Sequence, residues 1–148
     1  MMDLRELYQQ VIVDHNRNPR NFHKLDEPCQ QAEGHNPLCG DKVTVYVKVA
    51  DNSIQDVSFE GNGCAISVAS ASLMTEHLKG KSLKEEKSLF NSVHDALTEK
   101  DSDVDLMQFG KLGVLANVKN FPMRVKCATL CWHTLEAALN ETQSVTTE

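Results

Sequence analysis

The 148-residue chain has the composition of an ordinary globular protein, with 41% hydrophobic and 24% charged residues. Its formal net charge is −6 and it holds no basic run with interleaved aromatic residues, which argues against nucleic acid as a partner. No segment reaches the roughly 20 apolar residues that a membrane span requires, and the N-terminus MMDLRELYQQ lacks the basic-then-apolar order of a secretory signal. We therefore expect a cytoplasmic protein without membrane association, in which residues 1–148 form a single domain.

The first half of the chain predicts one helix followed by a β-hairpin. Apolar residues recur at helical spacing from Asp3, which suits an N-cap, to about His15. Residues 41–49 (DKVTVYVKV) alternate strictly and place four valines on one face. The turn ADNS then leads into a second strand over 54–62, and residues 33–36 are expected to add a short edge strand before the hairpin.

The second half of the chain predicts helices. Gly80 can close a helix that begins after Cys64, and Ser82 with Glu85 forms a capping box for the next one. The remaining segments are an acidic surface loop at 100–105, a short helix over 106–115, a final helix from about 122 to 140 and a flexible tail over 141–148. Strands first and helices afterwards indicate an α+β fold, in which a small antiparallel β-sheet packs against several α-helices.

Three of the five cysteines fall at the ends of predicted elements. The count is odd and a reducing compartment is expected, which argues against a disulfide framework. Cys39 and Asp41, in the stretch HNPLCGD, stand at the entrance to the predicted hairpin, and Cys64 stands at its exit. If the hairpin forms, Cys39 and Cys64 are neighbours in space.

The last helix carries Cys127 outside its core stripe. That stripe consists of Val125, Ala128, Trp132, Leu135 and Leu139. Cys127 lies roughly 120° from its centre, whereas Cys131 flanks it and is expected to be a packing residue. Arg124, one turn before Cys127, and the helix N-terminus are expected to favour the thiolate of Cys127. His133 points elsewhere and is expected not to be a ligand.

Docking the last helix end-on to the same sheet edge would add Cys127 to Cys39, Asp41 and Cys64. Three thiolates and one carboxylate suit tetrahedral Zn²⁺. The spacing matches no zinc finger, so a second interpretation stays open, in which Cys64 and Cys127 pack in the core and CGD is only a turn. Cys29 is interpreted as a loop thiol without a role. The remaining histidines lack ligand spacing and are expected at the surface or at edges: His15, His23, His35, His77 and His94.

Four motifs carry a resemblance that covers nearly the whole chain in order. DHNRNPRNF, NPLCGD, GNGCAISVASASLMTE and RVKCATLCWHTLEAAL resemble motifs of the U-type iron–sulfur cluster assembly proteins, the IscU/NifU N-terminal-like family. The resemblance implies an IscU/SufU-like fold. It also implies that Cys39, Asp41, Cys64 and Cys127 are the metal ligands.

Two departures from the IscU scaffolds resemble the SufU branch of this family. Lys126 stands where IscU proteins have a histidine, and a helix-sized insertion separates Cys64 from Cys127. The SufU resemblance implies a zinc-dependent, sulfurtransferase-like protein that accepts persulfide sulfur on Cys39 from a SufS-type cysteine desulfurase, with SUF scaffold or target apoproteins as further partners. Cys39 suits the acceptor role because it lies on a Pro/Gly loop, while Cys64 and Cys127 are held at helix starts.

Two other functions remain open. The first is a scaffold on which a [2Fe–2S] or [4Fe–4S] cluster is assembled on the same ligands, which the absence of a histidine beside Cys127 disfavours. The second is a structural zinc domain that only binds partners, which Asp41 disfavours because closed structural sites usually use only cysteine and histidine.

Overall fold

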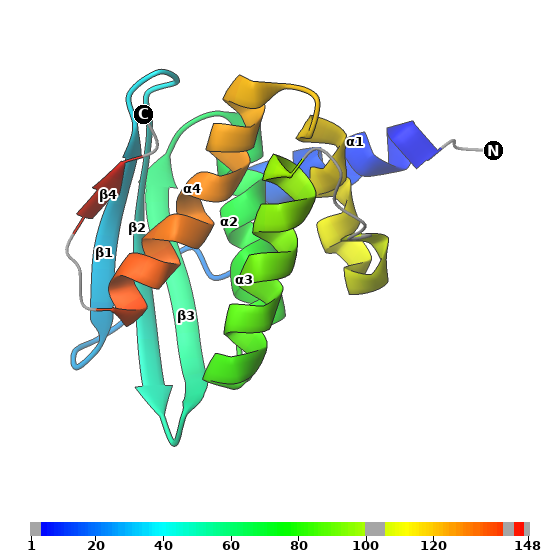
Figure 1. Cartoon of the computed structure of the whole chain (residues 1–148). Coiled ribbons are helices and arrows are strands. Elements are labelled where there is room, and N and C mark those ends of the chain that lie inside the picture. The colour runs from blue at the N-terminus through cyan, green and yellow to red at the C-terminus, as the bar shows by residue number, and fades with distance from the viewer. Residues whose placement is uncertain (1–3, 100–105, 141–143, 147–148) are drawn as a thin grey trace.

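In the computed structural model a sheet forms one layer, and helices pack against it to form a second layer (Figure 1). Residues 4–99, 106–140 and 144–146 are described. In chain order the elements are α1 Leu4–Arg17, β1 Gln30–Asn36, β2 Asp41–Ala50, β3 Ser53–Asn62, α2 Ala65–Leu78, α3 Leu83–Thr98, the 3-10 helix η1 Leu106–Val118, α4 Pro122–Leu139 and β4 Ser144–Thr146. The order of the strands in the sheet is β3-β2-β1-β4, with antiparallel pairing among β1, β2 and β3. The predicted α+β class is confirmed.

The central hairpin, β2–β3, is confirmed and turns at Asp51 and Asn52. Both residues have positive φ angles, +53° and +60°, as a two-residue type I′ turn requires. The valines of β2 predicted to share a buried face are buried except for the last, Val49, which is 37% exposed. A register shift between Lys48 and Val49 explains the difference, because it breaks the alternation at the end of the strand.

Helix α4 lies across β1 and β2, and α2 packs beside it against β3 (Figure 1). Ala128, Trp132 and Leu135 of the predicted stripe are fully buried, while Val125 and Leu139 are partly buried against the same core. Gly34 of β1 permits this close packing, since a Cβ at that position would overlap the side chain of Thr134. The approach of α4 to the sheet carries Cys127 to the end of β1.

The helix boundaries follow the predicted caps. Gly80, with φ of +86°, follows α2, and Ser82 and Glu85 form the predicted capping box of α3. The short helix expected over 106–115 is a 3-10 helix that continues to Val118. The acidic loop expected at 100–105 lies outside the described residues. No helix in the described part of the chain is long and apolar enough to cross a membrane.

The sheet edges differ from the expectation. β1 is longer than the predicted strand, and Ser144–Thr146, placed in the predicted flexible tail, form β4 and pair in parallel with Glu33–His35. The outer side of β1 offers unpaired backbone groups, which explains why a short segment of the tail is ordered there. Residues 141–143 and 147–148 lie outside the described residues.

The outer edge of β3 is also paired within the chain. The N–H of Phe59 donates to the carbonyl of Asn21 at 3.0 Å, and the N–H of Ile54 donates to the carbonyl of Lys81 at 2.8 Å. The N–H of Gly80 in turn donates to the carbonyl of Ile54 at 2.9 Å. Segments before β1 and after α2 therefore cover two parts of this edge.

Candidate metal centre

The loop between β1 and β2 presents Cys39 at the surface. The N–H of Cys39 donates to the carbonyl of Asn36 at 3.3 Å, and the N–H of Leu38 donates to the side-chain Oδ1 of Asn36 at 3.3 Å. Gly40 then takes a φ of +72°, which a residue with a Cβ adopts only at a cost, and leads the chain into β2. This tight turn leaves Cys39 exposed next to the first residue of β2, Asp41.

Asp41 is fully buried and is held by the other end of the hairpin. Its Oδ1 accepts a hydrogen bond from the backbone N–H of Cys64 at 2.8 Å, and its Oδ2 lies 3.9 Å from the Cys64 thiol. Gly63 makes this approach possible, because a Cβ there would overlap the Asp41 carboxyl group. The predicted proximity of the hairpin entrance and exit is therefore observed, with Asp41 as the direct contact.

Helix α4 brings Cys127 to the same place. Pro122 begins the helix, and Cys127 is buried with its Sγ 3.4 Å from the Sγ of Cys39. The side-chain Nδ2 of Asn36 lies 3.7 Å from the Cys127 Sγ. The expected arrival of Cys127 at the site is therefore observed, but α4 lies lengthwise across β1 and β2 rather than end-on to the sheet edge, so the expected mode of docking was wrong.

The four predicted ligands gather at one end of the sheet, three of them most closely. The candidate ligand atoms of Cys39, Asp41 and Cys127 all lie within 4.8 Å of one another. Cys64 joins this group through its contacts with Asp41. The thiols differ in exposure, since Cys39 is exposed, Cys64 half-buried and Cys127 buried. Cys39 is therefore the most accessible thiol of the group.

The electrostatic surroundings of Cys127 differ from the prediction. Burial, followed by contacts with Asp41, Cys39 and Cys64, raises the pKa of the Cys127 thiol well above its ordinary value. Arg124 is not among the main causes of the shift, and its guanidinium lies over the Phe121 ring, 5.0 Å from the ring centre. The prediction that Arg124 favours the thiolate was therefore wrong.

The donor set fits a metal ion. Burying the Asp41 carboxylate beside thiols is unfavourable unless a cation balances its charge. A bound cation would also lower the pKa of the Cys127 thiol, which burial and its neighbours otherwise raise. Three sulfur donors and one oxygen suit Zn²⁺, and thiolates also suit iron–sulfur clusters. This chemistry favours a metal site over the interpretation in which the cysteines are only core residues.

Three residues expected outside the site lie outside it. Cys29 is half-buried with its thiol 3.8 Å from the carbonyl of Leu25, and Cys131 is buried with its Sγ 3.5 Å from the Ser70 hydroxyl. The ring of His133 contacts the rings of Phe90 and His94, with centroid distances of 5.6 and 5.5 Å.

His15 corrects a prediction. It was expected at the surface or at an edge but is fully buried, with its Nδ1 2.7 Å from the Ser72 hydroxyl. Burial lowers the pKa of His15 and disfavours its charged form. The reason for the difference is the packing of α1 against α2, which no local pattern reports.

Asn36 is the residue of the site that the sequence did not identify. It is fully buried, its backbone and side chain both shape the Cys39 turn, and its amide reaches Cys127. An asparagine before proline is a turn signal, and this was the only indication available. Its contact with Cys127 depends on where α4 docks.

Comparisons with known proteins agree with this arrangement. The family model of the NifU-like N-terminal domain matches residues 7–143. The zinc-dependent sulfurtransferase SufU of Bacillus subtilis is 41% identical over 134 residues, which cover 90% of each chain. The iron–sulfur cluster assembly scaffold protein IscU of Streptococcus pyogenes is 37% identical over 92% of this chain and 84% of its own length.

A solved structure matches as well. A candidate iron–sulfur cluster assembly scaffold protein for the SUF system from Fervidobacterium islandicum has a TM-score of 0.82 and 36% identity, over 93% of this chain and 99% of that one. The predicted resemblance is thereby confirmed along nearly the whole chain. The protein belongs to the family of NifU-like N-terminal domains, the U-type iron–sulfur cluster assembly proteins to which SufU and IscU are assigned.

Proposed function

We propose that the protein is a zinc-dependent persulfide acceptor and carrier that works with a SufS-type cysteine desulfurase in iron–sulfur cluster assembly. The observation that carries the proposal is the exposed Cys39 thiol, 3.4 Å from the buried Cys127 thiol and grouped with Asp41. An acceptor must be reachable by a partner, and of the thiols in this group Cys39 is the one that is exposed. The similarity to the SufU of Bacillus subtilis supports the same assignment.

Cys39, Asp41, Cys64 and Cys127 would hold the zinc. Bound zinc keeps thiolate ligands deprotonated near neutral pH, where the surroundings of Cys127 alone favour the thiol. Asp41 is held in place by the N–H of Cys64, and Asn36 orients both the Cys39 turn and Cys127. Three of the four residues are therefore fixed by the sheet and helix ends, while Cys39 lies on a turn.

The transfer step uses the thiolate of Cys39 as nucleophile. The Cys39 sulfur attacks the terminal sulfur of the desulfurase persulfide and forms a new S–S bond. The S–S bond of the donor breaks, and the desulfurase cysteine leaves as a thiolate with the bonding electron pair. Cys39 then carries the persulfide, which SUF scaffold or target apoproteins accept by the same type of exchange.

The experiment that tests this function locates the transferred sulfur. The protein is incubated with a SufS-type desulfurase and cysteine, and peptide mapping by mass spectrometry seeks one added sulfur atom on Cys39. Cys39→Ser should carry no added sulfur and should not stimulate the desulfurase, because an alcohol cannot form a persulfide. Added sulfur on Cys64 or Cys127 with Cys39 unmodified would overturn the acceptor assignment.

A second function is a scaffold on which an iron–sulfur cluster is built on the same residues. The similarity to the IscU of Streptococcus pyogenes, over 92% of this chain, favours it. Anaerobic reconstitution with iron and sulfide separates the two functions. A stable cluster together with no sulfur transfer to the zinc-loaded protein would select the scaffold.

A further inference from the structure

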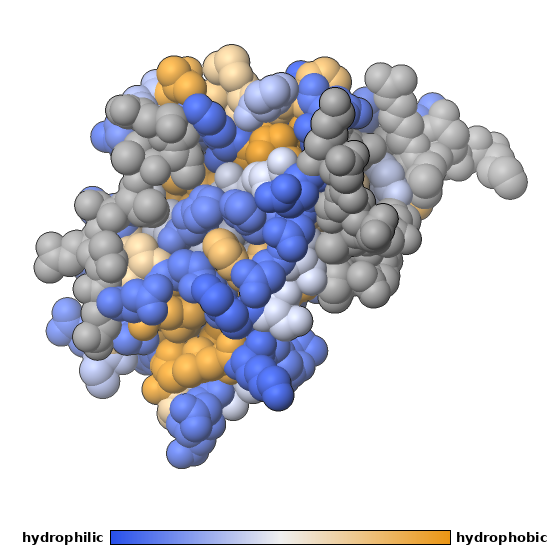
Figure 2. All heavy atoms as spheres, in the orientation of Figure 1, coloured by the Kyte–Doolittle hydropathy of each residue, from blue (hydrophilic) through white to orange (hydrophobic). Residues whose placement is uncertain are grey.

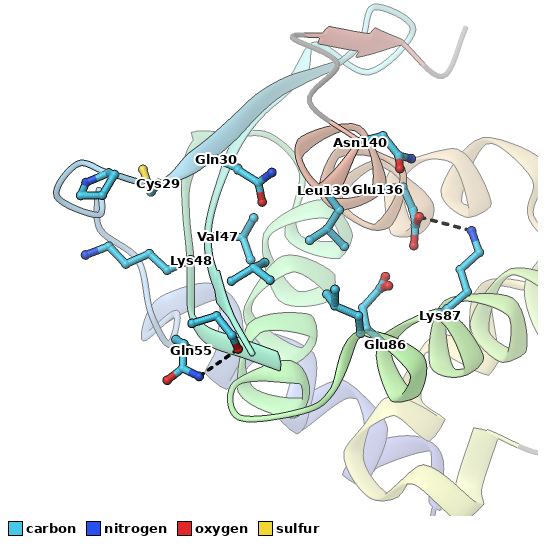
Figure 3. Close-up of a pocket in the computed structure, with 14 residues that line it drawn as sticks. Cys29, Gln30, Val47, Lys48, Gln55, Glu86, Lys87, Glu136, Leu139 and Asn140 are labelled. Atoms are coloured by element: carbon cyan, nitrogen blue, oxygen red, sulfur yellow. Dashed lines mark hydrogen bonds and ion pairs between the residues drawn. The ribbon is translucent and has the colours of Figure 1, made fainter. Parts of the chain in front are cut away.

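A pocket lies at the opposite end of the sheet from Cys39. It has a volume of about 970 Å³ and is bounded by β1, β2, α3 and α4 (Figure 3). Glu136 of its wall lies nine residues after Cys127 on α4, roughly 14 Å along the helix axis. Figure 2 shows exposed apolar atoms between the lower ends of α3 and α4, bordered by hydrophilic residues. This pocket is therefore separate from the candidate metal centre.

Two acidic side chains from different helices line the pocket. Glu86 of α3 is only 2% exposed, and the side chain of Glu136 of α4 is 15% exposed. One oxygen of each carboxyl group, Oε1, is buried and has no hydrogen-bond partner among the described residues. Lys87 approaches from the solvent side, with its Nζ 3.3 Å from Oε2 of Glu136 (Figure 3). One lysine thus faces two carboxyl groups, and Glu86 has no cation of its own in the described structure.

The rest of the lining is mainly apolar. Val47 of β2 and Leu139 of α4 lie beside the two carboxyl groups (Figure 3), and Leu83 of α3 also lines the pocket. Lys48 also lines the pocket, but Figure 3 shows its side chain extending away from Glu86 and Glu136. An apolar wall next to a buried acidic pair suits a ligand with a carbon chain and a positively charged end.

We propose that this pocket binds an amphipathic organic cation, a guanidinium or primary ammonium group on an apolar chain, with the N–H groups donating to Glu86 and Glu136. Such a donor bonds to the buried Oε1 atoms in place of the proton that the two carboxyl groups share, and charge-assisted hydrogen bonds of this kind are the strong ones. The carbon chain covers the valine and leucine walls. The inference concerns a different end of the molecule from the proposed sulfur transfer and does not depend on it.

Binding of the cation releases a proton. Burial, followed by a side-chain hydrogen bond with Glu136 and the charge of Glu136, raises the pKa of Glu86 to about 9, so that Glu86 carries a proton at neutral pH and shares it with Glu136. The cation replaces this proton, which passes to the buffer. The other titratable groups around the pair are Lys87 of α3, His133 of α4, Lys48 of β2 and Cys29 at the start of β1.

The test is calorimetric titration of the full chain with n-butylguanidinium, which stays charged at every pH used. We expect the affinity to rise about tenfold per pH unit between about pH 6 and pH 8, with one proton released per ligand. Glu86→Gln should weaken binding by about ten- to a hundredfold and remove the pH dependence. If Glu86→Gln does not fold, Glu136→Gln provides the second variant and should weaken binding to a similar extent.

The matched control is Glu99→Gln, an exposed glutamate at the end of α3 outside the pocket lining, which should bind like the wild type. A blocked Gly-Arg-Gly peptide distinguishes the source of the cation. Tighter binding of the peptide identifies an arginine side chain of a partner, and binding of n-butylguanidinium alone identifies a free organic cation. The proposal is overturned if the wild type binds neither probe at millimolar concentration, or if it and Glu86→Gln bind equally.

Discussion

Asp41 and Cys64, 23 positions apart in the chain, are joined by a hydrogen bond of 2.8 Å from the backbone N–H of Cys64 to Oδ1 of Asp41. One carboxylate therefore has two roles. It is a candidate metal ligand, and it closes the open end of the β2–β3 hairpin onto the start of α2. Structural and metal-binding effects of a substitution at this position must consequently be measured separately.

Two substitutions of Asp41 separate these roles. Asp41→Ala leaves the N–H of Cys64 without its acceptor, so the metal-free protein should lose about 1–3 kcal/mol of unfolding free energy. Asp41→Asn keeps an acceptor oxygen and should lose less, yet it removes the negative charge and should also bind zinc more weakly. Urea unfolding in the presence of a chelator and zinc titration provide the two measurements. Equal stability of the two variants would show that the hydrogen bond is unimportant.

Gly63→Ala tests the close approach of the backbone to Asp41. The new Cβ would overlap the Asp41 carboxyl group and displace it, so zinc content should fall and unfolding free energy should drop by about 1–3 kcal/mol. Gly80→Ala is the control, because φ is positive there but no atom lies within 4 Å of the new Cβ. It should cost about 1 kcal/mol in stability and leave zinc content unchanged.

Substitutions outside the group should leave zinc binding intact. Cys29→Ala, Cys131→Ala and His133→Ala should each retain the zinc content of the wild type, measured by metal analysis of the purified protein. Cys131→Ala should cost on the order of 1 kcal/mol, since it leaves a small void beside Trp132 in the core. Loss of zinc from any of the three would mean that the ligand set is misassigned.

Glu86→Gln should change how stability depends on pH. Folding raises the pKa of Glu86 from 4.5 to about 9, so the folded state binds the Glu86 proton more tightly than the unfolded state does. The stabilisation from this proton is fully present below about pH 4.5 and is lost as the pH rises toward 9. The glutamine has no such loss, and the variant should be more stable than the wild type by at least about 1 kcal/mol near pH 8. Urea unfolding of both proteins between about pH 4.5 and pH 9 measures this difference in stability, and Glu99→Gln is the control that should follow the wild-type curve. A constant difference at every pH would contradict the assignment.

The parts of the fold that follow local rules could be predicted from the sequence. Alternating valines defined β2, and the capping box of Ser82 defined the start of α3, because these signals depend on neighbours in the chain. The hairpin alone predicted that Cys39 and Cys64 meet. Cys127 needed the family resemblance or an assumption about helix docking, since it lies 63 positions after Cys64 in the chain. The single-domain organisation and the cytoplasmic location stay predictions.

The parts that depend on packing between distant elements could not be predicted. The burial of His15 depends on α2, the contact of Asn36 with Cys127 depends on α4, and the facing pair of Glu86 and Glu136 depends on how α3 meets α4. Each of these polar residues is typical of surfaces and turns when the sequence is considered locally. Asn36, Glu86 and Glu136 lie at sites with proposed chemistry, which is where local expectation and tertiary structure are expected to disagree, whereas the burial of His15 reflects only the packing of α1 against α2.

The pairing of both sheet edges within the chain bears on how the protein behaves at high concentration. β4 occupies part of the outer side of β1, and segments around Asn21 and Lys81 occupy parts of the outer side of β3. A strand with a free edge is a template for strands of other molecules, and such addition leads to fibres and precipitates. Here another molecule must first displace a segment of the same chain at these positions. By occupying the outer side of β1, β4 therefore disfavours self-association through that edge.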